Sequence, residues 1–230
     1  MIYTIDHIAK STPNNRRPGR PMQPQYITIH NTGNEKSTAQ NERAWLTNPS
    51  NNVTASYHIV IDEREAIECI PLNEIAWHAG DGNGQGNTAS IGIEICESGD
   101  YAKTLENAVQ LVANMLHQRD WGVDRLRRHF DWSGKICPRL MYDKGSWKPW
   151  DEFKHRIQRQ LDSVNAGTEG DVEIMEISVP HLGNIKIQVG EQELQGIVID
   201  GVSYVPVRSL AEALGKQVEW DQQTKTVSVK

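Results

Sequence analysis

Residues 26–34 read Tyr-Ile-Thr-Ile-His-Asn-Thr-Gly-Asn, an apolar, β-branched run that gives way to turn-forming residues. The run predicts a buried strand over residues 26–30, because β-branched side chains favour extended backbone. Residues 31–34 predict a loop. His30 is therefore expected at a strand end, where functional sites are commonly assembled.

Strands and helices alternate along the first two thirds of the chain. Further apolar runs predict strands at residues 53–62, 66–70 and 90–96, the first two joined by a tight turn. Helical spacing of apolar residues predicts helices at residues 42–46, 104–122 (with Thr104 as the N-cap) and 150–161. We therefore expect an α/β domain with a mixed central β-sheet flanked by helices.

The two ends of the chain differ from this central part. Residues 1–25 are rich in Asn, Arg and Pro, which predicts an extended arm lying over the domain. A composition change near residue 165 predicts a linker, after which short strands, a helix at 209–214 and a closing hairpin predict a small α+β domain. The expected boundaries are a large domain at 1–164, a linker at 165–174 and the small domain at 175–230.

Composition excludes several classes of protein. The net charge of −6 argues against a nucleic-acid binder, which needs clustered Lys and Arg. Cys69, Cys96 and Cys137 show no pairing pattern, so a disulfide framework is not expected. Residues 1–10 lack the apolar core of a signal peptide, and no run has membrane-spanning length. We expect synthesis in the cytoplasm without a signal peptide and no membrane partner; the oligomeric state stays open.

Residues 127–138, Arg-Arg-His-Phe-Asp-Trp-Ser-Gly-Lys-Ile-Cys-Pro, concentrate chemically active side chains in one segment. His129 and Cys137 are residue types that bind zinc, and His30 can supply a third ligand. Three ligands leave the fourth tetrahedral position for water, the arrangement of a catalytic zinc. The alternative for each residue alone is structural: a hydrogen-bonded histidine, or a cysteine packed as a small hydrophobe.

Glu94 and Lys135 complete this zinc hypothesis. Glu94 interrupts an apolar strand, where a carboxylate is costly unless it has a partner or a task. It is suited to take a proton from water and deliver it to a leaving amine. Lys135 can stabilise the oxyanion formed at a carbonyl carbon. Together these residues predict amide hydrolysis, although each charge alone is also consistent with a solvated surface group.

Five motifs occur along the chain in this order: Ile-Thr-Ile-His-Asn-Thr (27–32), Ser-Tyr-His-Ile-Val-Ile-Asp (56–62), Ala-Trp-His-Ala-Gly (76–80), Ser-Ile-Gly-Ile-Glu-Ile (90–95) and His-Phe-Asp-Trp-Ser-Gly-Lys-Ile-Cys-Pro (129–138). Together they resemble the type 2 N-acetylmuramoyl-L-alanine amidases, a family that includes phage and prophage endolysins and is similar in fold to peptidoglycan recognition proteins. The resemblance implies a zinc enzyme that cuts the amide between N-acetylmuramic acid and L-alanine in peptidoglycan.

The resemblance also implies roles for individual residues. It implies that zinc is held by His30, His129 and Cys137, that Glu94 is the catalytic carboxylate and that Lys135 stabilises the transition state. By the same resemblance, Tyr57 matches a tyrosine beside the metal, with core packing of its ring as the alternative. His78 matches a histidine outside the metal shell that is expected to contact substrate. Asp131 is expected to contact substrate or to orient a ligand histidine.

The tail resembles the small domain at the N-terminus of some copper amine oxidases, which also occurs in surface proteins of Gram-positive bacteria. The matching residues are Ile-Asp-Gly-Val-Ser-Tyr-Val-Pro-Val-Arg-Ser-Leu-Ala-Glu-Ala-Leu-Gly (199–215). The tail has only one histidine and no cysteine, so a copper site is not expected there. We expect a wall-binding or assembly module, with a spacer as the alternative.

Three alternatives stay open at the level of sequence. A peptidoglycan-binding protein without activity, as found among recognition proteins, would share the fold. A zinc peptidase cutting within the stem peptide would share the chemistry. A phage endolysin, released to the wall by a holin or by lysis, and a host autolysin would share the sequence features.

Overall fold

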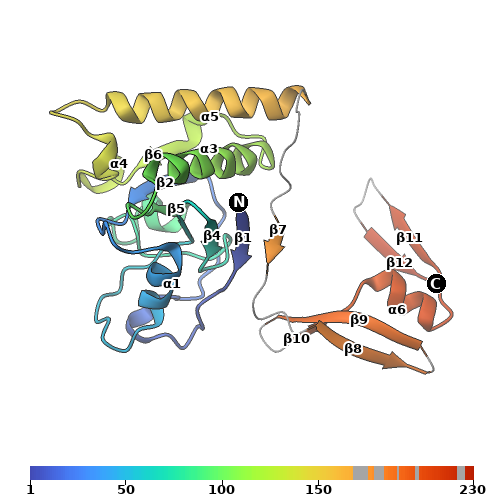
Figure 1. The fold of residues 1–230 in the computed structure, drawn as a ribbon. Coiled ribbons are helices and arrows are strands. Elements are labelled where there is room, and N and C mark those ends of the chain that lie inside the picture. Colours follow the sequence, from blue (N-terminus) through green and yellow to red (C-terminus); the bar gives the residue numbers. More distant parts are fainter. Residues whose placement is uncertain (168–175, 179–183, 191, 200–201, 222–225) are drawn as a thin grey trace. The chain divides into compact units, whose positions relative to one another are not determined.

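The computed structural model describes residues 1–167, 176–178, 184–190, 192–199, 202–221 and 226–230 (Figure 1). The chain divides into two compact units, Met1–Ser178 and Val179–Lys230. The first unit contains a seven-stranded sheet, and the second contains a three-stranded sheet and a two-stranded hairpin. Within the described part of the chain, no helix is long and apolar enough to cross a membrane.

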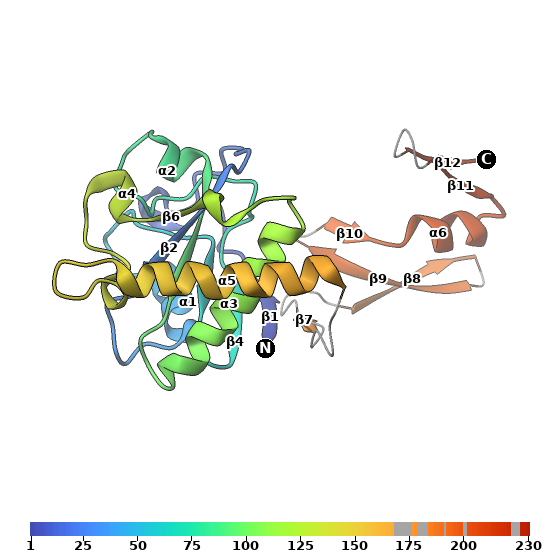
Figure 2. The ribbon, with the colours of Figure 1, turned by 90° about the horizontal axis from the view of Figure 1, so that it is seen from above.

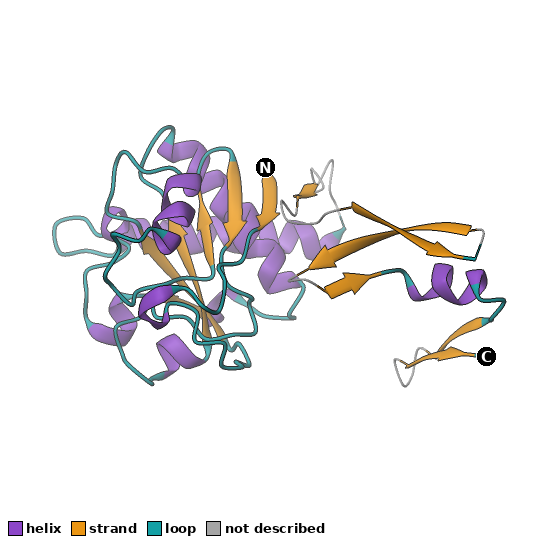
Figure 3. Ribbon diagram, turned by 90° about the horizontal axis from the view of Figure 1, so that it is seen from below, coloured by secondary structure: helices purple, strands orange, loops and turns teal. Residues whose placement is uncertain are grey.

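A mixed sheet forms the centre of the first unit, and Figure 3 separates its strands from the surrounding helices. The strand order is β6-β2-β5-β3-β4-β1-β7. All neighbouring pairs are parallel except β3 and β4, which are antiparallel. The predicted fold class is confirmed. The strands are β1 Ile2–Ile5, β2 Tyr26–Asn31, β3 Ile59–Ile61, β4 Glu65–Glu68, β5 Ser90–Ile95, β6 Leu126–Arg128 and β7 Glu176–Ser178.

Helices flank this sheet. The helices of the first unit are α1 Ala39–Thr47, α2 Gln85–Thr88, α3 Tyr101–His117, α4 Phe130–Ser133 and α5 Lys148–Ala166. The largest apolar cluster joins one sheet face to α3 and α5, and α5 packs along α3 (Figures 1 and 2). A second cluster packs α1 against β3 and β4. The two clusters give the sheet a buried layer on each face.

Alternation along the strands places the polar residues of interest on one face. Ile29 of β2 and Ile93 of β5 lie in the core that includes α3. Successive side chains of a strand point to opposite faces, so His30 and Glu94 point away from that core. The two residues are also register partners across the parallel pair β2 and β5. Glu94 can therefore interrupt an apolar run, because its carboxylate lies on the sheet face opposite the core that includes α3.

The extended arm predicted at residues 1–25 is wrong in part, because its first residues form β1 within the central sheet. Farther along, the fully buried Arg16 donates hydrogen bonds to the backbone carbonyls of Leu46, Asn51 and Val53. The Pro- and Asn-rich composition indicated irregular backbone correctly. It gave no signal that a buried guanidinium ties this segment to the domain.

The predicted N-cap of α3 is also wrong. The helix begins at Tyr101, and the carboxylate of Asp100 caps it by accepting from the backbone N–H of Lys103 at 3.1 Å. Thr104 lies in the first turn, and its hydroxyl donates to the carbonyl of Asp100. Two capping residue types lie close together here, and the anionic one also suits the positive end of the helix dipole.

Only the end of the strand predicted at residues 53–62 is a strand, namely β3. At Val53 the backbone bonds to side chains instead of to a neighbouring strand: its N–H donates to the Asn51 side chain, and its carbonyl accepts from Arg16. The β-branched composition alone could not reveal this competition.

The second unit has its own small sheet and hairpin. Its elements are β8 Asn184–Val189, β9 Gln192–Ile199, β10 Val202–Tyr204, α6 Val207–Ala213, β11 Val218–Asp221 and β12 Thr226–Val229. The first three strands are antiparallel in the order β10-β9-β8. Helix α5 runs into the start of the predicted linker, and residues 168–174 lie outside the described residues. Between residues 168 and 183 only residues 176–178 are described; they form β7, which pairs with β1 in the first unit.

Candidate active site

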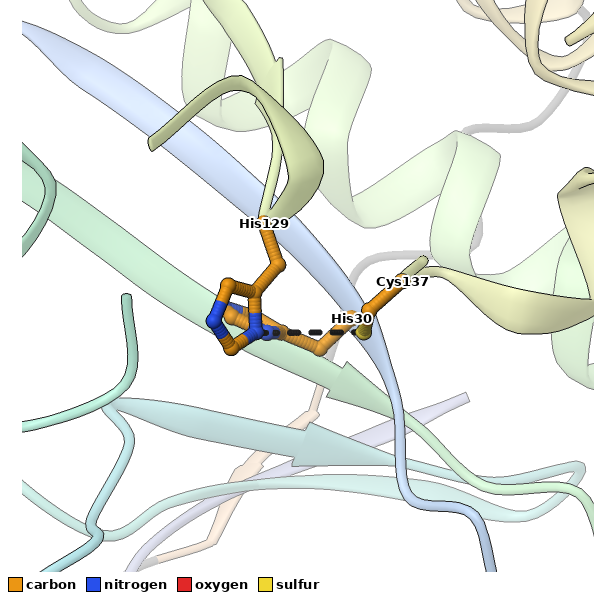
Figure 4. A group of neighbouring side chains, drawn as sticks. All are labelled: His30, His129 and Cys137. Atoms are coloured by element: carbon orange, nitrogen blue, oxygen red, sulfur yellow. Dashed lines mark hydrogen bonds between the residues drawn. The ribbon is translucent and has the colours of Figure 1, made fainter. Parts of the chain in front are cut away.

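Three side chains from separate elements converge at one end of the sheet (Figure 4). His30 lies near the end of β2, His129 follows the end of the adjacent strand β6, and Cys137 lies beyond α4. Because β2 and β6 are parallel neighbours, their carboxyl ends meet at the same edge. The candidate ligand atoms of the three residues all lie within 4.8 Å of one another.

The spacing of these atoms fits a tetrahedral zinc ion. Nδ1 of His30 lies 3.1 Å from Nδ1 of His129 and 3.8 Å from Sγ of Cys137. Zinc at its usual bond lengths separates two nitrogen ligands by about 3.3 Å and a nitrogen and a sulfur ligand by about 3.6 Å. The chemistry of the donors, two imidazoles and a thiol, also suits this metal.

Hydrogen bonds behind the histidines orient their free lone pairs. The carbonyl of Ser90 can only accept, so Nε2 of His78, 3.1 Å away, carries the hydrogen and Nδ1 of His78 is an acceptor. Nε2 of His30 therefore donates to Nδ1 of His78 at 3.0 Å, which leaves Nδ1 of His30 unprotonated. The carbonyl of Ala79 accepts a hydrogen bond from His129 in the same manner. Such partners fix the ring orientation of metal-binding histidines.

Burial keeps these imidazoles neutral, as metal binding requires. Desolvation, with a smaller electrostatic contribution from His58, lowers the pKa of His78 to about 3. Desolvation also lowers the pKa of His129 to about 4. The pKa of His30 is also lowered by burial and by the surrounding histidines. At neutral pH all of these rings present lone pairs rather than charges.

The segment that carries Cys137 is anchored to the end of β2. The side chain of Asn31 accepts from the backbone N–H of Leu140 at 3.0 Å, and Arg139 forms an ion pair with the buried carboxylate of Glu97.

Burial raises the pKa of the Cys137 thiol to about 12, and a hydrogen bond from the backbone of Asn31 opposes this rise. No neighbouring protein cation is thus strong enough to ionise the thiol. A bound divalent metal ion would supply the positive charge that favours the thiolate.

Glu94 lies beside the three candidate ligands. Its Oε1 atom is 3.9 Å from Nδ1 of His30, and its side chain is 16% exposed. The buried Oε2 atom has no hydrogen-bond partner among the described residues. Desolvation, helped by Glu42 and opposed by Lys135, raises the pKa of Glu94 to about 8. A carboxyl group with these properties is suited to exchange protons near neutral pH.

A cavity of about 340 Å³ brings the predicted residues together. Seven of the eight residues predicted from the sequence line it: His30, Tyr57, His78, Glu94, His129, Lys135 and Cys137. Lys135 is exposed, and its charge lowers the pKa values of both Glu94 and His129. One cavity thus holds a possible metal site, a carboxyl group and an ammonium group, which is a set suited to hydrolysis.

Residues 20–140, more than half of the chain, match the family model described as N-acetylmuramoyl-L-alanine amidase. The chain belongs to this family. Residues 184–230 match the family model described as copper amine oxidase N-terminal domain. Both resemblances predicted from the sequence are confirmed.

Individual amidases of the family are similar over the first unit. The chain is 46% identical over 153 residues to CwlA of Bacillus subtilis (strain 168), covering 64% of this chain and 54% of that protein. It is 44% identical over 146 residues to XlyB of the same organism, covering 61% of this chain and 44% of XlyB. The solved catalytic domain of XlyA matches with a TM-score of 0.62 at 42% identity, covering 68% of this chain and 99% of that chain. The chain spans about half the length of the curated relatives it matches.

Tyr57, His78 and Asp131 have protein partners in this amidase fold. The hydroxyl of Tyr57 donates to the backbone carbonyl of Glu42 at 2.8 Å. Both ring nitrogens of His78 are bonded within the protein, so the ring stands behind His30. Asp131 is outside the cavity lining, and its carboxylate binds the backbone N–H and guanidinium of Arg128. The catalytic role beside the metal predicted for Tyr57 and the substrate contacts predicted for His78 and Asp131 stay predictions.

Several residues that shape the cavity were not predicted from the sequence. Glu42, Trp45 and Val53 line the cavity, and Arg16 holds the backbone of this wall. Glu42 and Trp45 fall in a predicted helix, but nothing in their spacing distinguishes them from surface residues. For Arg16 the sequence contained no signal at all, since an arginine in a Pro-rich segment is ordinarily exposed.

Proposed function

We propose that this chain is a zinc-dependent amidase that hydrolyses the amide bond between N-acetylmuramic acid and L-alanine in bacterial peptidoglycan. Membership of the amidase family and the cavity around His30, His129 and Cys137 support this proposal. The one observation that carries it is the position of Glu94, whose Oε1 lies beside a donor set with the spacing of a tetrahedral metal site and whose Oε2 has no hydrogen-bond partner in the described part of the chain.

In this proposal the protein would supply the ligands and zinc would supply the Lewis acid. His30 and His129 would hold the metal through Nδ1, and Cys137 would hold it through its thiolate. Zinc in such a site lowers the pKa of a water molecule to about 7 and polarises a carbonyl group. His78 and the carbonyl of Ala79 hold the two imidazoles in the required tautomer.

Glu94 acts as the general base and then as the general acid. Its carboxylate takes a proton from the attacking water, and the resulting carboxylic acid gives the proton to the nitrogen of the departing L-alanine. A pKa raised by burial suits both steps, because the group can hold and release a proton near neutral pH. Lys135 places a positive charge in the same cavity, where it stabilises the negative oxygen of the tetrahedral intermediate.

Mass spectrometry of digested peptidoglycan tests this function. We expect stem peptides with a new N-terminal L-alanine, together with glycan strands that retain intact muramic acid. Fragments cut between stem residues would identify a zinc peptidase instead. Binding to walls without any cleavage product would identify a peptidoglycan-binding protein without activity. The product masses distinguish the first two results, and the absence of any product identifies the third.

We further propose that the second unit, which matches the copper amine oxidase N-terminal domain model, is a wall-binding or assembly module. The whole protein would act on the cell wall after release from the cytoplasm. A chain ending at Gly167, the C-cap of α5, should remain a folded hydrolase with altered binding to intact walls. Unchanged binding would favour a role as a spacer.

A further inference from the structure

Glu42 is a carboxylate in the cavity that the proposed reaction does not use. It lies on α1 and lines the same cavity as Glu94 and Lys135. The Ser37 side chain donates a hydrogen bond to its carboxylate, and the hydroxyl of Tyr57 lies 3.5 Å from its Oε2 atom. These contacts hold the carboxylate in place without neutralising it.

Among the described residues Glu42 forms no ion pair. The adjacent Arg43 pairs with Asp6 at 2.9 Å instead. Desolvation raises the pKa of Glu42, which shows that the protein makes its ionised form less favourable than water does. A partly buried charge without a partner costs free energy, so a binding partner from solution would regain part of that cost.

The charges lining the cavity separate into two groups. Glu94 and Lys135 are the ones assigned to the reacting amide, which leaves Glu42 as the remaining charge in the lining. Two exposed apolar side chains line the cavity as well: Trp45 is 45% exposed and Val53 is 54% exposed. An anion accompanied by apolar surface is complementary to an alkyl ammonium group.

We propose that Glu42 is a substrate-binding residue that pairs with a primary ammonium group of the wall polymer. This inference rests on the proposed function and names a determinant of its specificity. Peptidoglycan can carry such a group in two places: the side-chain amine of the diamino acid in the stem peptide, and a glucosamine that has lost its acetyl group. The stem amine becomes an amide when stems are cross-linked, so stems with a free amine would be the better substrates.

Three soluble muropeptides separate the two sources. The first has a free stem amine and fully N-acetylated sugars. The second is identical except that its stem amine is acetylated. The third keeps the acetylated stem amine and carries one deacetylated glucosamine. We would measure kcat/KM of the zinc-loaded protein, of Glu42→Gln, and of Glu152→Gln, a control at an exposed carboxylate on α5.

We expect the wild type and Glu152→Gln to prefer one ammonium-bearing substrate over the second substrate by roughly tenfold, the effect of one charge-assisted hydrogen bond. Whether the first or the third substrate is preferred identifies the source of the amine. Within Glu42→Gln, whatever its overall rate, the ratio of kcat/KM between the preferred substrate and the second substrate should fall to about one.

Equal cleavage of all three substrates by the wild type would overturn the inference without any variant. A preference that survives in Glu42→Gln would overturn it too. Failure of the wild type to cleave any of the three would instead contradict the proposed function.

Discussion

Nε2 of His30 donates a hydrogen bond to Nδ1 of His78 at 3.0 Å, and Nε2 of His78 donates in turn to the carbonyl of Ser90. This chain sets the tautomer of His30, so that its unprotonated Nδ1 faces His129 and Cys137. A buried backbone carbonyl thus determines which nitrogen is available to a metal.

Replacing His78 with Phe should weaken zinc binding, because His30 loses the acceptor that fixes its tautomer. We expect a loss of affinity of about 10- to 100-fold, measured by competition with a chelator. His155→Phe, at an exposed histidine on α5, is the matched control and should bind zinc like the wild type. Equal affinities of the two variants would show that His78 does not support the site.

Gly92 gives His78 the space that it occupies. A Cβ atom at position 92 would lie 2.6 Å from Cγ of His78, closer than real contacts allow. Gly92→Ala should therefore displace the ring, lower the melting temperature and weaken zinc binding. In a protein that already carries His78→Ala, Gly92→Ala should lower the melting temperature much less, because the ring that it would contact is absent. Additive losses in the double variant would disprove this contact as the cause.

Glu94→Gln should bind zinc but lose turnover by roughly two to four orders of magnitude, the usual contribution of a general base. The amide is isosteric with the carboxyl group and cannot take a proton from water. Zinc content is measured by elemental analysis and turnover by release of stem peptide. Activity close to that of the wild type would assign the base to another residue.

The buried histidines predict a loss of stability in acid. Burial lowers the pKa values of His58 and His129 to about 4, and that of His78 to about 3. Between pH 6.5 and these values the unfolded chain binds protons that the metal-free native protein does not, so the free energy of unfolding should fall as the pH falls. Glu94 acts in the opposite sense, since its raised pKa favours the native state as the pH falls from about 8. Urea unfolding of metal-free Glu94→Gln removes the opposing contribution of Glu94, and a flat profile from pH 7 to 4.5 would contradict this prediction.

Arg16 should determine the shape of the cavity wall. Its guanidinium binds the carbonyls of Leu46, Asn51 and Val53, three residues that line the cavity. A lysine cannot reach all three, and each carbonyl left unpaired costs about 1–3 kcal/mol. We expect Arg16→Lys to lower the unfolding free energy by at least about 2 kcal/mol and to raise KM more than it lowers kcat. Arg20→Lys, on the same segment, is the control. Equal effects of the two substitutions would show that Arg16 has no special role in shaping the cavity wall.

The candidate site was more predictable than the fold around it. The sequence motifs identified His30, His129 and Cys137 as candidate ligands. The alternation of side chains along a strand explains why His30 and Glu94 lie on the same face of the sheet. These features depend on local sequence, because a histidine at a strand end keeps its position whatever the distant contacts are.

Long-range contacts explain what was missed. Arg16 bonds across 30 to 37 residues of sequence, and it binds the carbonyl of Val53 at the start of the predicted strand. The cap of α3 was missed because Asp100 and Thr104 are both capping types and only the geometry distinguishes them. Periodicity and residue type carry no information about such choices.

The most direct measurement starts from metal-free protein and purified cell walls. New N-terminal L-alanine would be quantified by mass spectrometry before and after one equivalent of zinc is added, with Glu94→Gln treated in parallel. We predict almost no product without zinc, full recovery with it, and little product from the variant in either condition. Full release of N-terminal L-alanine by the rigorously metal-free protein would contradict the zinc site, and recovery without any new N-terminal L-alanine would contradict the amidase reaction.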